Sequence, residues 1–343
     1  MKRATITDVA RETGYSIATI SLVINQKNVS IPESTREKVW EAVNRLNYRP
    51  NQLAVSMITK KTKVLGLIIP DNSNVFFADL SKSIERAARR AGYSLIYGNS
   101  DNDPKRDLTY MRMFADRQVD GIIYAKSASF FQKDSEKSLQ FIKDSAIPLV
   151  TLDRHVDGSD TRSVQLNNFK GGYLATRHLL DLGHTRIGAF TGPNELVSSS
   201  ARLDGYRSAL EEAGVPFDER LVVEGDYQLG IAVKAAERFL NERATSVFCF
   251  NDLMACGLYR EIQQAGLSIP DDLSVVGFDN VFFSELIHPA LTTIEQPVSA
   301  MGEGVVTALL DVIEGREVPP EQRNLVYEPK LIVRSSTKRK GDA

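Results

Sequence analysis

The feature that most constrains the fold is an alternation of short apolar runs with longer amphipathic segments, which begins at Val64 and continues along most of the chain. Eight runs have the length and composition of buried strands: VLGLIIP, YSLIYG, GIIYA, PLVTLD, RIGAFTG, LVVEGD, SVFCFN and LSVVGFD. Strands that alternate with helices predict parallel sheets with helices on both faces. Because the runs form two successive sets, we predict an α/β body of two doubly wound parallel-sheet lobes. A cleft between such lobes is a natural ligand pocket.

Charge divides the chain into a basic N-terminal segment and an acidic remainder. Residues 1–63 contain 11 Lys and Arg against 5 Asp and Glu, whereas the other residues contain 31 against 39. The net charges are therefore +6 and −8, within a whole-chain value of −2. A basic segment on an acidic body favours contact with nucleic acid, although a solvated basic surface gives the same count.

Several classes of protein are disfavoured by what the sequence lacks. The N-terminal stretch MKRATITDVARETG has no apolar core of a signal peptide, and no apolar run is long enough to cross a bilayer. There is no Walker loop, nucleophile elbow or Rossmann glycine fingerprint. Cys249 and Cys256 form no CxxC pair, which is typical of core thiols in a reducing cytosol. The histidines lack metal-ligand spacing: His155, His178, His184 and His288. We expect a cytoplasmic protein that is not an enzyme, holds no cofactor or metal and does not enter a membrane.

The first 49 residues carry the start and stop signals of three helices. Thr5 and Asp8 form a T-x-x-D capping box for the first, Gly14 lies in the turn that ends it, and Ser16 caps the second. The third begins near Pro32 and has an apolar stripe of Val39, Ala42, Val43 and Leu46. Two short helices joined by a glycine-containing turn and braced by a third indicate a small all-α helix-turn-helix head.

The stretches TITDVARETGYSIATISLVIN and STREKVWEAVNRLNYRPNQLA closely resemble the N-terminal region of the lactose/galactose repressor (LacI/GalR) family. The resemblance implies a homodimeric transcription regulator that binds a pseudo-palindromic operator. It also implies a helix-turn-helix domain at 1–49, a hinge helix at 50–62, an effector-binding and dimerisation domain at 63–335 and a tail at 336–343. The N-lobe would comprise about 63–162 and 295–327, and the C-lobe about 163–294 and 328–335.

In this family the second helix lies in the major groove, and its base-reading positions fall on Ile17, Ala18 and Leu22. The family usually has Arg where this chain has Leu22, and a leucine packs on a thymine methyl group but cannot hydrogen-bond a base edge. We therefore expect readout through methyl contacts and DNA shape. Other apolar residues of this helix are expected in the core of the head: Ile20, Val23 and Ile24. The expected DNA contacts are Thr5, Ser16, Ile17, Ala18, Thr19, Ser21, Leu22, Asn25, Asn51 and Met57.

The stretch RPNQLAVSMITKKTK corresponds to the family's hinge helix, which folds in the minor groove when two copies meet. An apolar wedge from this helix, usually a leucine, enters between base steps and kinks the duplex. Met57 occupies the wedge position, and Lys60, Lys61 and Lys63 would lie close to the DNA backbone. A plain basic linker is the alternative interpretation.

Polar residues follow the strands in DNSNVFF, LDR, FNDLMA and GFDN, and others lie in ARLDGY and TIEQP. Singly, each stretch is also explained by helix capping or turn chemistry. As an ordered set they resemble the family's body and the periplasmic sugar-binding proteins, especially the ribose-binding type, up to about Arg334. Carboxylates, guanidinium forks and aromatic rings suit hydroxyls and sugar C–H faces. The resemblance assigns effector binding to Asn74, Phe76, Phe77, Asp153, Arg154, Arg202, Tyr227, Asn251, Asp279 and Gln296.

The function implied is that of a repressor whose operator affinity is changed by a small-molecule sugar, with D-ribose first and another pentose or hexose second. The C-terminal STKRKGDA lacks an apolar heptad, so we expect a dimer and not a tetramer. Two alternatives remain open. One is a catabolite-control regulator that binds a phosphocarrier protein, and the other is a purine-type regulator with a nucleobase as co-repressor.

Overall fold

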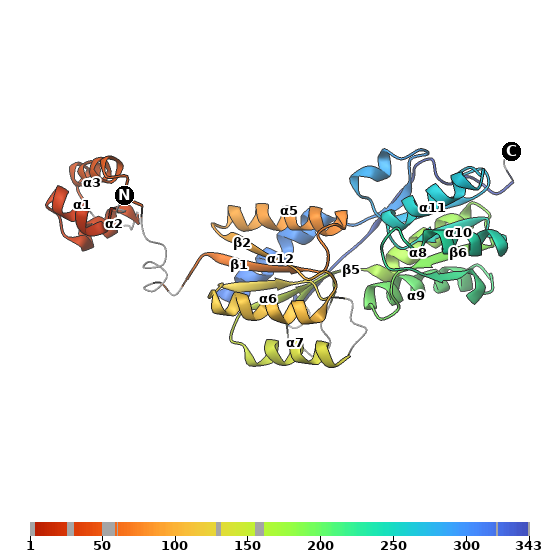
Figure 1. Ribbon diagram of the computed structural model, residues 1–343, viewed down its shortest axis with the longest axis horizontal. Helices are drawn as coiled ribbons and strands as arrows, with labels where there is room; N and C mark the ends of the chain where they lie inside the picture. Colours follow the sequence, from red (N-terminus) through yellow and green to blue (C-terminus); the bar gives the residue numbers. More distant parts are fainter. Residues whose placement is uncertain are drawn as a thin grey trace. The chain divides into compact units, whose positions relative to one another are not determined.

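The computed structural model describes residues 4–25, 31–49, 59, 61–127, 132–154, 161–319 and 322–341, without the side chains of 132–136 and 139. The chain divides into two compact units, Met1–Thr62 and Lys63–Ala343 (Figure 1). We call them the head and the body. The predictions for Asn51, Met57 and Lys60 concern positions outside the described residues.

The head consists of the helices α1 (Ile6–Thr13), α2 (Ile17–Ile24) and α3 (Glu33–Arg45). The capping box is present, because Asp8 Oδ2 accepts from the Thr5 backbone N–H at 2.9 Å and Thr5 Oγ1 accepts from the Asp8 N–H at 3.4 Å. Gly14 ends α1 at φ 76°, in the left-handed region that glycine adopts without strain. Ser16 caps α2, so the predicted helix starts are confirmed. The core of the head is made of Val9, Ile20, Val23, Val39, Ala42 and Val43.

The N-lobe of the body is a six-stranded parallel sheet in the order β11-β5-β4-β3-β1-β2. The strands are β1 (Val64–Ile69), β2 (Ser94–Asn99), β3 (Gly121–Tyr124), β4 (Leu149–Leu152), β5 (Arg162–Leu166) and β11 (Asn324–Tyr327). One face is covered by α5 (Val75–Arg90) and α12 (Val298–Ile313), and the other by α6 (Pro104–Asp116) and α7 (Gln132–Asp144) (Figure 1). Because both faces are covered, the inner strands are apolar throughout.

The C-lobe repeats this design in the order β12-β10-β9-β8-β6-β7, with β12 antiparallel to β10. The strands are β6 (Ile187–Thr191), β7 (Val222–Glu224), β8 (Ser246–Cys249), β9 (Ser274–Asp279), β10 (Thr292–Glu295) and β12 (Lys330–Ile332). The helices pack in two pairs, α8 (Asn168–Asp181) with α9 (Val197–Glu212) and α10 (Ala232–Asn241) with α11 (Asp252–Gln264). Two 3-10 turns complete the lobe, η1 (Glu219–Leu221) and η2 (Phe282–Glu285). No helix among the described residues is long and apolar enough to cross a membrane.

All eight predicted strands are present, but two expected boundaries were wrong. β5 pairs with β4 in the first sheet, so the N-lobe continues to Leu166 and does not end at residue 162. The expected tail is also part of the C-lobe over its described residues. Ser336 is fully buried, its Oγ donates to the Val275 carbonyl at 2.6 Å, and the Lys340 N–H donates to the Leu182 carbonyl at 2.8 Å.

Candidate functional site

A cavity of about 20 Å³ lies between the two lobes of the body. All ten predicted effector-binding residues line it, and Ser198 is the one lining residue that was not predicted. Ser198 stands one turn before Arg202 on α9, and this i, i+4 spacing is the signal that would have found it. The lining comprises Asn74, Phe76, Phe77, Asp153, Arg154, Ser198, Arg202, Tyr227, Asn251, Asp279 and Gln296.

The cavity forms where it does because most lining residues lie at or just after the carboxyl ends of parallel strands, which meet at one edge of each sheet. Asn74 follows β1 and caps α5, with its Oδ1 accepting from the Phe76 N–H at 3.0 Å. This cap places Phe76 and Phe77 in the first turn of α5, with ring centroids 5.0 Å apart in an edge-to-face arrangement. Both rings are buried, so they form an apolar wall of the cavity.

On the N-lobe side, Asp153 and Arg154 follow β4 and are both buried. Asp153 has φ 61°, a left-handed conformation that is uncommon for a residue with a side chain. Arg154 Nη1 donates to the Lys126 carbonyl at 3.0 Å and to Asn102 Oδ1 at 3.2 Å, which fixes the guanidinium. Burial lowers the pKa of Arg154, and the nearby Asp153 carboxylate partly opposes this shift.

On the C-lobe side, Arg202 is held by α9, which packs closely against α8. Its Nε donates to Asn168 Oδ1 at 2.8 Å, its Nη1 donates to the Phe250 carbonyl, and its guanidinium lies 3.5 Å from the centroid of the Phe278 ring. A Cβ atom at Gly172 of α8 would lie 2.1 Å from the Arg202 carbonyl oxygen. The close approach of the two helices therefore requires glycine there, and it sets the position of Arg202.

Asp279 is the last residue of β9, with φ 114°, and its Oδ1 accepts from Gln296 Nε2 at 2.7 Å. Burial raises the pKa of Asp279 well above its ordinary value, whereas the positive charge of Arg202 opposes the shift. A second carboxyl group, Asp252, is fully buried in the first turn of α11 and was not predicted. It accepts from Thr293 Oγ1 at 2.6 Å and from the Val281 N–H at 3.0 Å, and burial raises its pKa to about 7.

Four buried polar atoms of the lining have no hydrogen-bond partner among the described residues. They are Asp153 Oδ1, Arg154 Nε, Tyr227 OH and Gln296 Oε1. A buried polar group without a partner costs about 1–3 kcal/mol, so such groups are paired in most folded proteins. Their concentration in one cavity indicates a site for a ligand with several hydroxyl groups or other hydrogen-bonding atoms.

In the head, α2 turns a continuous stripe of side chains outward. Ile17 is 48% exposed, Ala18 and Asn25 are exposed, and Ser21 and Leu22 are partly exposed. Of the residues expected in the core, Ile20 and Val23 are fully buried, whereas Ile24 is half-buried and packs against the core.

The predicted polar contacts of the head bond to one another along α1 and α2. Ser16 Oγ lies 2.9 Å from Thr19 Oγ1, and Asn25 Nδ2 donates to the Ser21 carbonyl at 2.8 Å. The Thr5 side chain belongs to the capping box of α1. An apolar stripe flanked by small polar side chains suits the major groove, where methyl groups and phosphates are both within reach.

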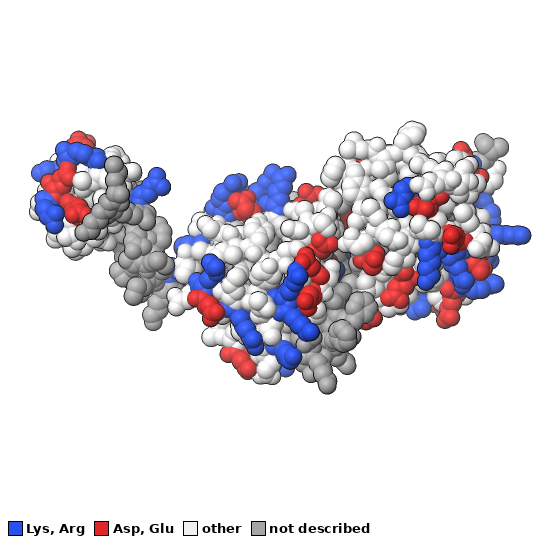
Figure 2. Space-filling view, viewed as in Figure 1, with Lys and Arg blue, Asp and Glu red and all other residues white. Residues whose placement is uncertain are grey.

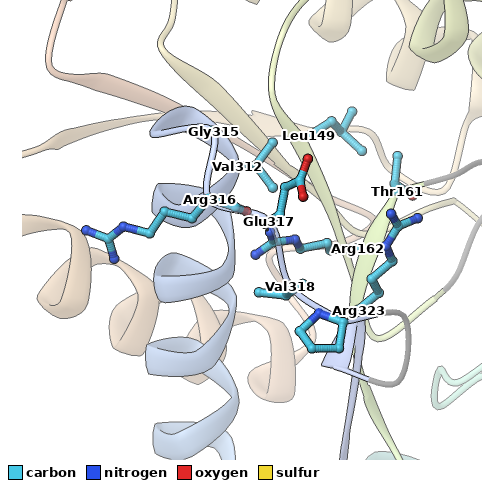
Figure 3. A pocket seen from close by; sticks show the side chains of 10 residues that line it. Leu149, Thr161, Arg162, Val312, Gly315, Arg316, Glu317, Val318 and Arg323 are labelled. Carbon is cyan, nitrogen blue, oxygen red and sulfur yellow. Dashed lines mark hydrogen bonds between the residues drawn. The ribbon is translucent and has the colours of Figure 1, made fainter.

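A larger depression lies near the amino ends of β4 and β5, away from the predicted residues (Figure 3). Two of its arginines, Arg162 and Arg316, are paired with Asp311, at 3.6 and 3.0 Å, and Arg316 is also paired with Glu314. Because these charges are already neutralised within the lobe, we do not regard the depression as a ligand site.

A helix-turn-helix head joined to a two-lobed α/β body with a buried polar cavity defines a DNA-binding regulator that has a small-molecule site. Residues 5–51 match the family model of bacterial regulatory proteins, lacI family, and residues 176–337 match the periplasmic binding protein-like domain. The chain belongs to the lacI family of bacterial regulatory proteins, and it is therefore a DNA-binding transcription regulator.

Relatives with assigned names match over nearly the whole chain. A protein of Vibrio campbellii named HTH-type transcriptional repressor PurR is 38% identical over 340 residues, which is 98% of this chain and 99% of the relative. The HTH-type transcriptional regulator DegA of Bacillus subtilis is 36% identical over 336 residues, which is 98% of each chain.

Two solved structures show the same fold. The Lac repressor dimer bound to operator and the anti-inducer ONPF has a TM-score of 0.86 at 28% identity, covering 98% of this chain and 100% of that chain. A LacI family transcriptional regulator from Enterococcus faecium with bound ribose has a TM-score of 0.71 at 33% identity, covering 80% and 99%.

Proposed function

We propose that this regulator is a repressor whose operator affinity is set by a monosaccharide in the cavity between the lobes, with D-ribose as the first candidate. The four unpaired buried polar atoms of the lining carry this proposal. A sugar supplies a hydroxyl group for each of them, because a hydroxyl both donates and accepts hydrogen bonds.

The chemistry of the lining also favours a sugar over a nucleobase. Asp153 and Asp279 accept hydrogen bonds, and the forks of Arg154 and Arg202 bridge neighbouring oxygens. The apolar face of a pentose would pack on the phenylalanine rings of α5. A flat base would use fewer charged forks and more stacking. The regulator from Enterococcus faecium with bound ribose supports the pentose, whereas the similarity to proteins named PurR keeps a nucleobase as the second candidate.

We infer that α2 lies in the major groove of the operator. Ile17, Ala18 and Leu22 would contact base edges, and the polar residues beside them would contact phosphates. The exposed apolar stripe of α2 supports this placement, because a short helix gains nothing from exposing a large aliphatic side chain to water. Met57 stays the expected minor-groove wedge.

We also propose that two copies of the chain form a homodimer that acts in the cytoplasm, where the operator is. Phe282 and Leu286 are 66% and 73% exposed, and Leu229 and Val233 of the same lobe are 40% and 46% exposed. Figure 2 shows few charged side chains over the upper part of the C-lobe, where the segment after β9 lies in Figure 1. A wide uncharged surface with exposed large apolar residues is typical of a subunit interface.

Calorimetry with D-ribose and with the Asp279→Ala variant tests the effector. We expect ribose to bind the unchanged protein and to bind the variant about 5- to 150-fold more weakly, because Asp279 lies in the cavity and a lost buried hydrogen bond costs about 1–3 kcal/mol. Asp204→Ala, which removes an exposed carboxylate from α9, is the control and should bind ribose normally. Both variants should still bind operator DNA. The proposed effector would be overturned if no free monosaccharide bound while a nucleobase, a sugar phosphate or a phosphocarrier protein did.

A further inference from the structure

A second cavity adjoins the first at the mouth of the cleft between the lobes. It has a volume of about 170 Å³ and shares four lining residues with the inner cavity: Asn74, Phe77, Arg154 and Tyr227. Its other walls come from both lobes and were not predicted from the sequence. They are Asp71, Asn102, Pro193, Leu196, Asp226 and Gln228. We call this space the mouth chamber.

A hydrogen bond across the cleft fixes one side of the mouth chamber. Gln228 Nε2 of the C-lobe donates to Asp71 Oδ2 of the N-lobe at 2.9 Å. The other oxygen of Asp71 accepts from Ser73, from the N–H at 2.8 Å and from Oγ at 2.7 Å. Asp226 Oδ1 accepts from the Gln228 N–H at 2.8 Å. Two carboxylates, one from each lobe, are therefore held at the mouth by defined hydrogen bonds.

The charge of the chamber is negative despite Arg154. That guanidinium is buried beside Asp153, with its Nε 3.7 Å from Asp153 Oδ2, so much of its charge is already balanced. Apart from Arg154, none of the described residues that line the chamber is a cation that could balance Asp71 and Asp226. A phosphate that entered would meet two like charges, the partly buried carboxylate of Asp71 and the exposed carboxylate of Asp226.

The remaining walls suit an uncharged group. Leu196 is 5% exposed, and together with Pro193 and the ring of Phe77 it offers apolar surface. The amides of Asn102 and Gln228 offer hydrogen bonds to a neutral polar group. Arg154 Nε and Tyr227 OH are buried and have no hydrogen-bond partner among the described residues. Both residues line the chamber as well as the inner cavity, so one ligand can extend through both spaces.

We propose that the mouth chamber is a subsite for an uncharged substituent on the bound sugar, and that Asp71 and Asp226 exclude a phosphate from it. The site would bind free pentoses and neutral pentosides, including nucleosides, and would not bind sugar phosphates. The inference rests on the proposed function, because it takes the occupant of the inner cavity to be a pentose.

Calorimetry with five probes tests the subsite: D-ribose, methyl β-D-ribofuranoside, 5-O-methyl-D-ribose, ribose 1-phosphate and ribose 5-phosphate. We expect at least one methyl derivative to bind with an affinity within about tenfold of that of ribose. The ribose phosphate substituted on the same carbon should bind at least about 100-fold more weakly than that methyl derivative, because juxtaposed like charges cost several kcal/mol.

Variants of residues that line the chamber distinguish the effect of its charge on ligand binding from the effect of its volume. Asp71→Asn and Asp226→Asn should each reduce the affinity ratio between the methyl derivative and the corresponding phosphate by about tenfold. Each substitution removes one repelling charge while keeping the side-chain size. Asp204→Asn, on the exposed surface of α9, should leave this affinity ratio unchanged. Leu196→Trp should fill the chamber, so that the methyl derivative is lost and ribose still binds.

The outcomes are distinguishable from those of the effector proposal. If ribose binds and neither methyl derivative does, the chamber is not a subsite. If the affinity ratio between methyl derivative and phosphate is the same in the Asp71 and Asp226 variants as in the unchanged protein, the carboxylates do not exclude the phosphate. If ribose itself does not bind, the proposed function is wrong and this inference falls with it.

Discussion

At the residue scale, we propose that the operator preference of this regulator depends on Leu22. It stands in the exposed stripe of α2 at a position where the family usually has Arg. We predict that Leu22→Arg shifts the preferred operator toward guanine at the contacted step by about 1–3 kcal/mol, because a guanidinium fork can bond guanine O6 and N7.

Selection from random operators, performed with the unchanged protein and with the Leu22→Arg variant, measures this shift. Asn44→Arg is the control, because it adds the same charge on the exposed surface of α3. Recovery of one and the same operator by the unchanged protein and the Leu22→Arg variant would show that this position does not read bases.

Two acidic residues of the effector cavity share an unusual backbone. Asp153 has φ 61° and Asp279 has φ 114°, and each stands where a strand ends. Non-glycine residues in this region store about 1–3 kcal/mol of strain, which the surrounding fold must compensate. The strained turns aim both carboxyl groups at one cavity, so the geometry of the site is set by backbone conformation as well as by side-chain packing.

At the scale of elements, the contact between α8 and α9 decides where Arg202 lies. We predict that Gly172→Ala lowers the free energy of unfolding by about 1–3 kcal/mol, because the new methyl group meets backbone atoms that have to move. Sugar affinity should fall in parallel, since the atoms that move belong to Arg202. Urea denaturation and calorimetry give the two values.

Gly230→Ala is the matched control for this prediction. A Cβ atom at Gly230 would have no neighbour within 4 Å, and this glycine has no positive φ. Its stability and sugar affinity should be nearly unchanged. Equal effects of the two substitutions would mean that the approach of α8 and α9 does not position Arg202.

The buried carboxyl group of Asp252 at the start of α11 makes a second prediction at this scale. Its pKa is about 7 in the folded protein and about 4 in an unfolded chain, so between these values the folded state holds a proton that the unfolded state has lost. Stability should therefore fall as pH rises from about 4 to about 7, by at most about 1.4 kcal/mol per pH unit from this group, and then level off.

Thermal unfolding between pH 4 and pH 8, with and without Asp252→Asn, measures this contribution. The variant cannot ionise, so its stability should fall less steeply over the same range. Part of the slope should remain, because the raised pKa of Asp279 acts in the same direction. An unchanged slope in the variant would show that Asp252 does not titrate in this range.

For the whole molecule, we propose that the separation of charge between residues 1–63 and the acidic remainder contributes strongly to DNA binding. We predict a steep fall of operator affinity with salt, with about −0.9 in the slope of log K against log salt for each phosphate neutralised by the paired heads. Fluorescence anisotropy of labelled operator at several salt concentrations gives the slope. A flat response would contradict a contact dominated by the Lys and Arg residues of this segment.

The sequence by itself determined the features that depend on local pattern. Capping residues and apolar periodicity placed the helices of the head, and runs rich in apolar residues placed eight of the strands. The residues at the ends of those strands, ordered by a family resemblance, were the ten that now line one cavity. The predictions of helices and strands succeeded because buried strands and capped helices require particular residue types wherever they occur in the fold. The binding role of the ten residues stays a prediction.

Only the tertiary structure decided the features that depend on distant partners. β5 and β10 are short and rich in polar residues, and β11 and β12 have only four and three residues, so their strand character comes from the neighbours with which they pair. The same holds for the lobe boundary at Leu166, for the buried Ser336 and for the bond between Asp71 and Gln228, which are 157 residues apart. A polar side chain has no local periodicity that reveals its partner, because that partner is chosen when the two sheets and their loops pack together.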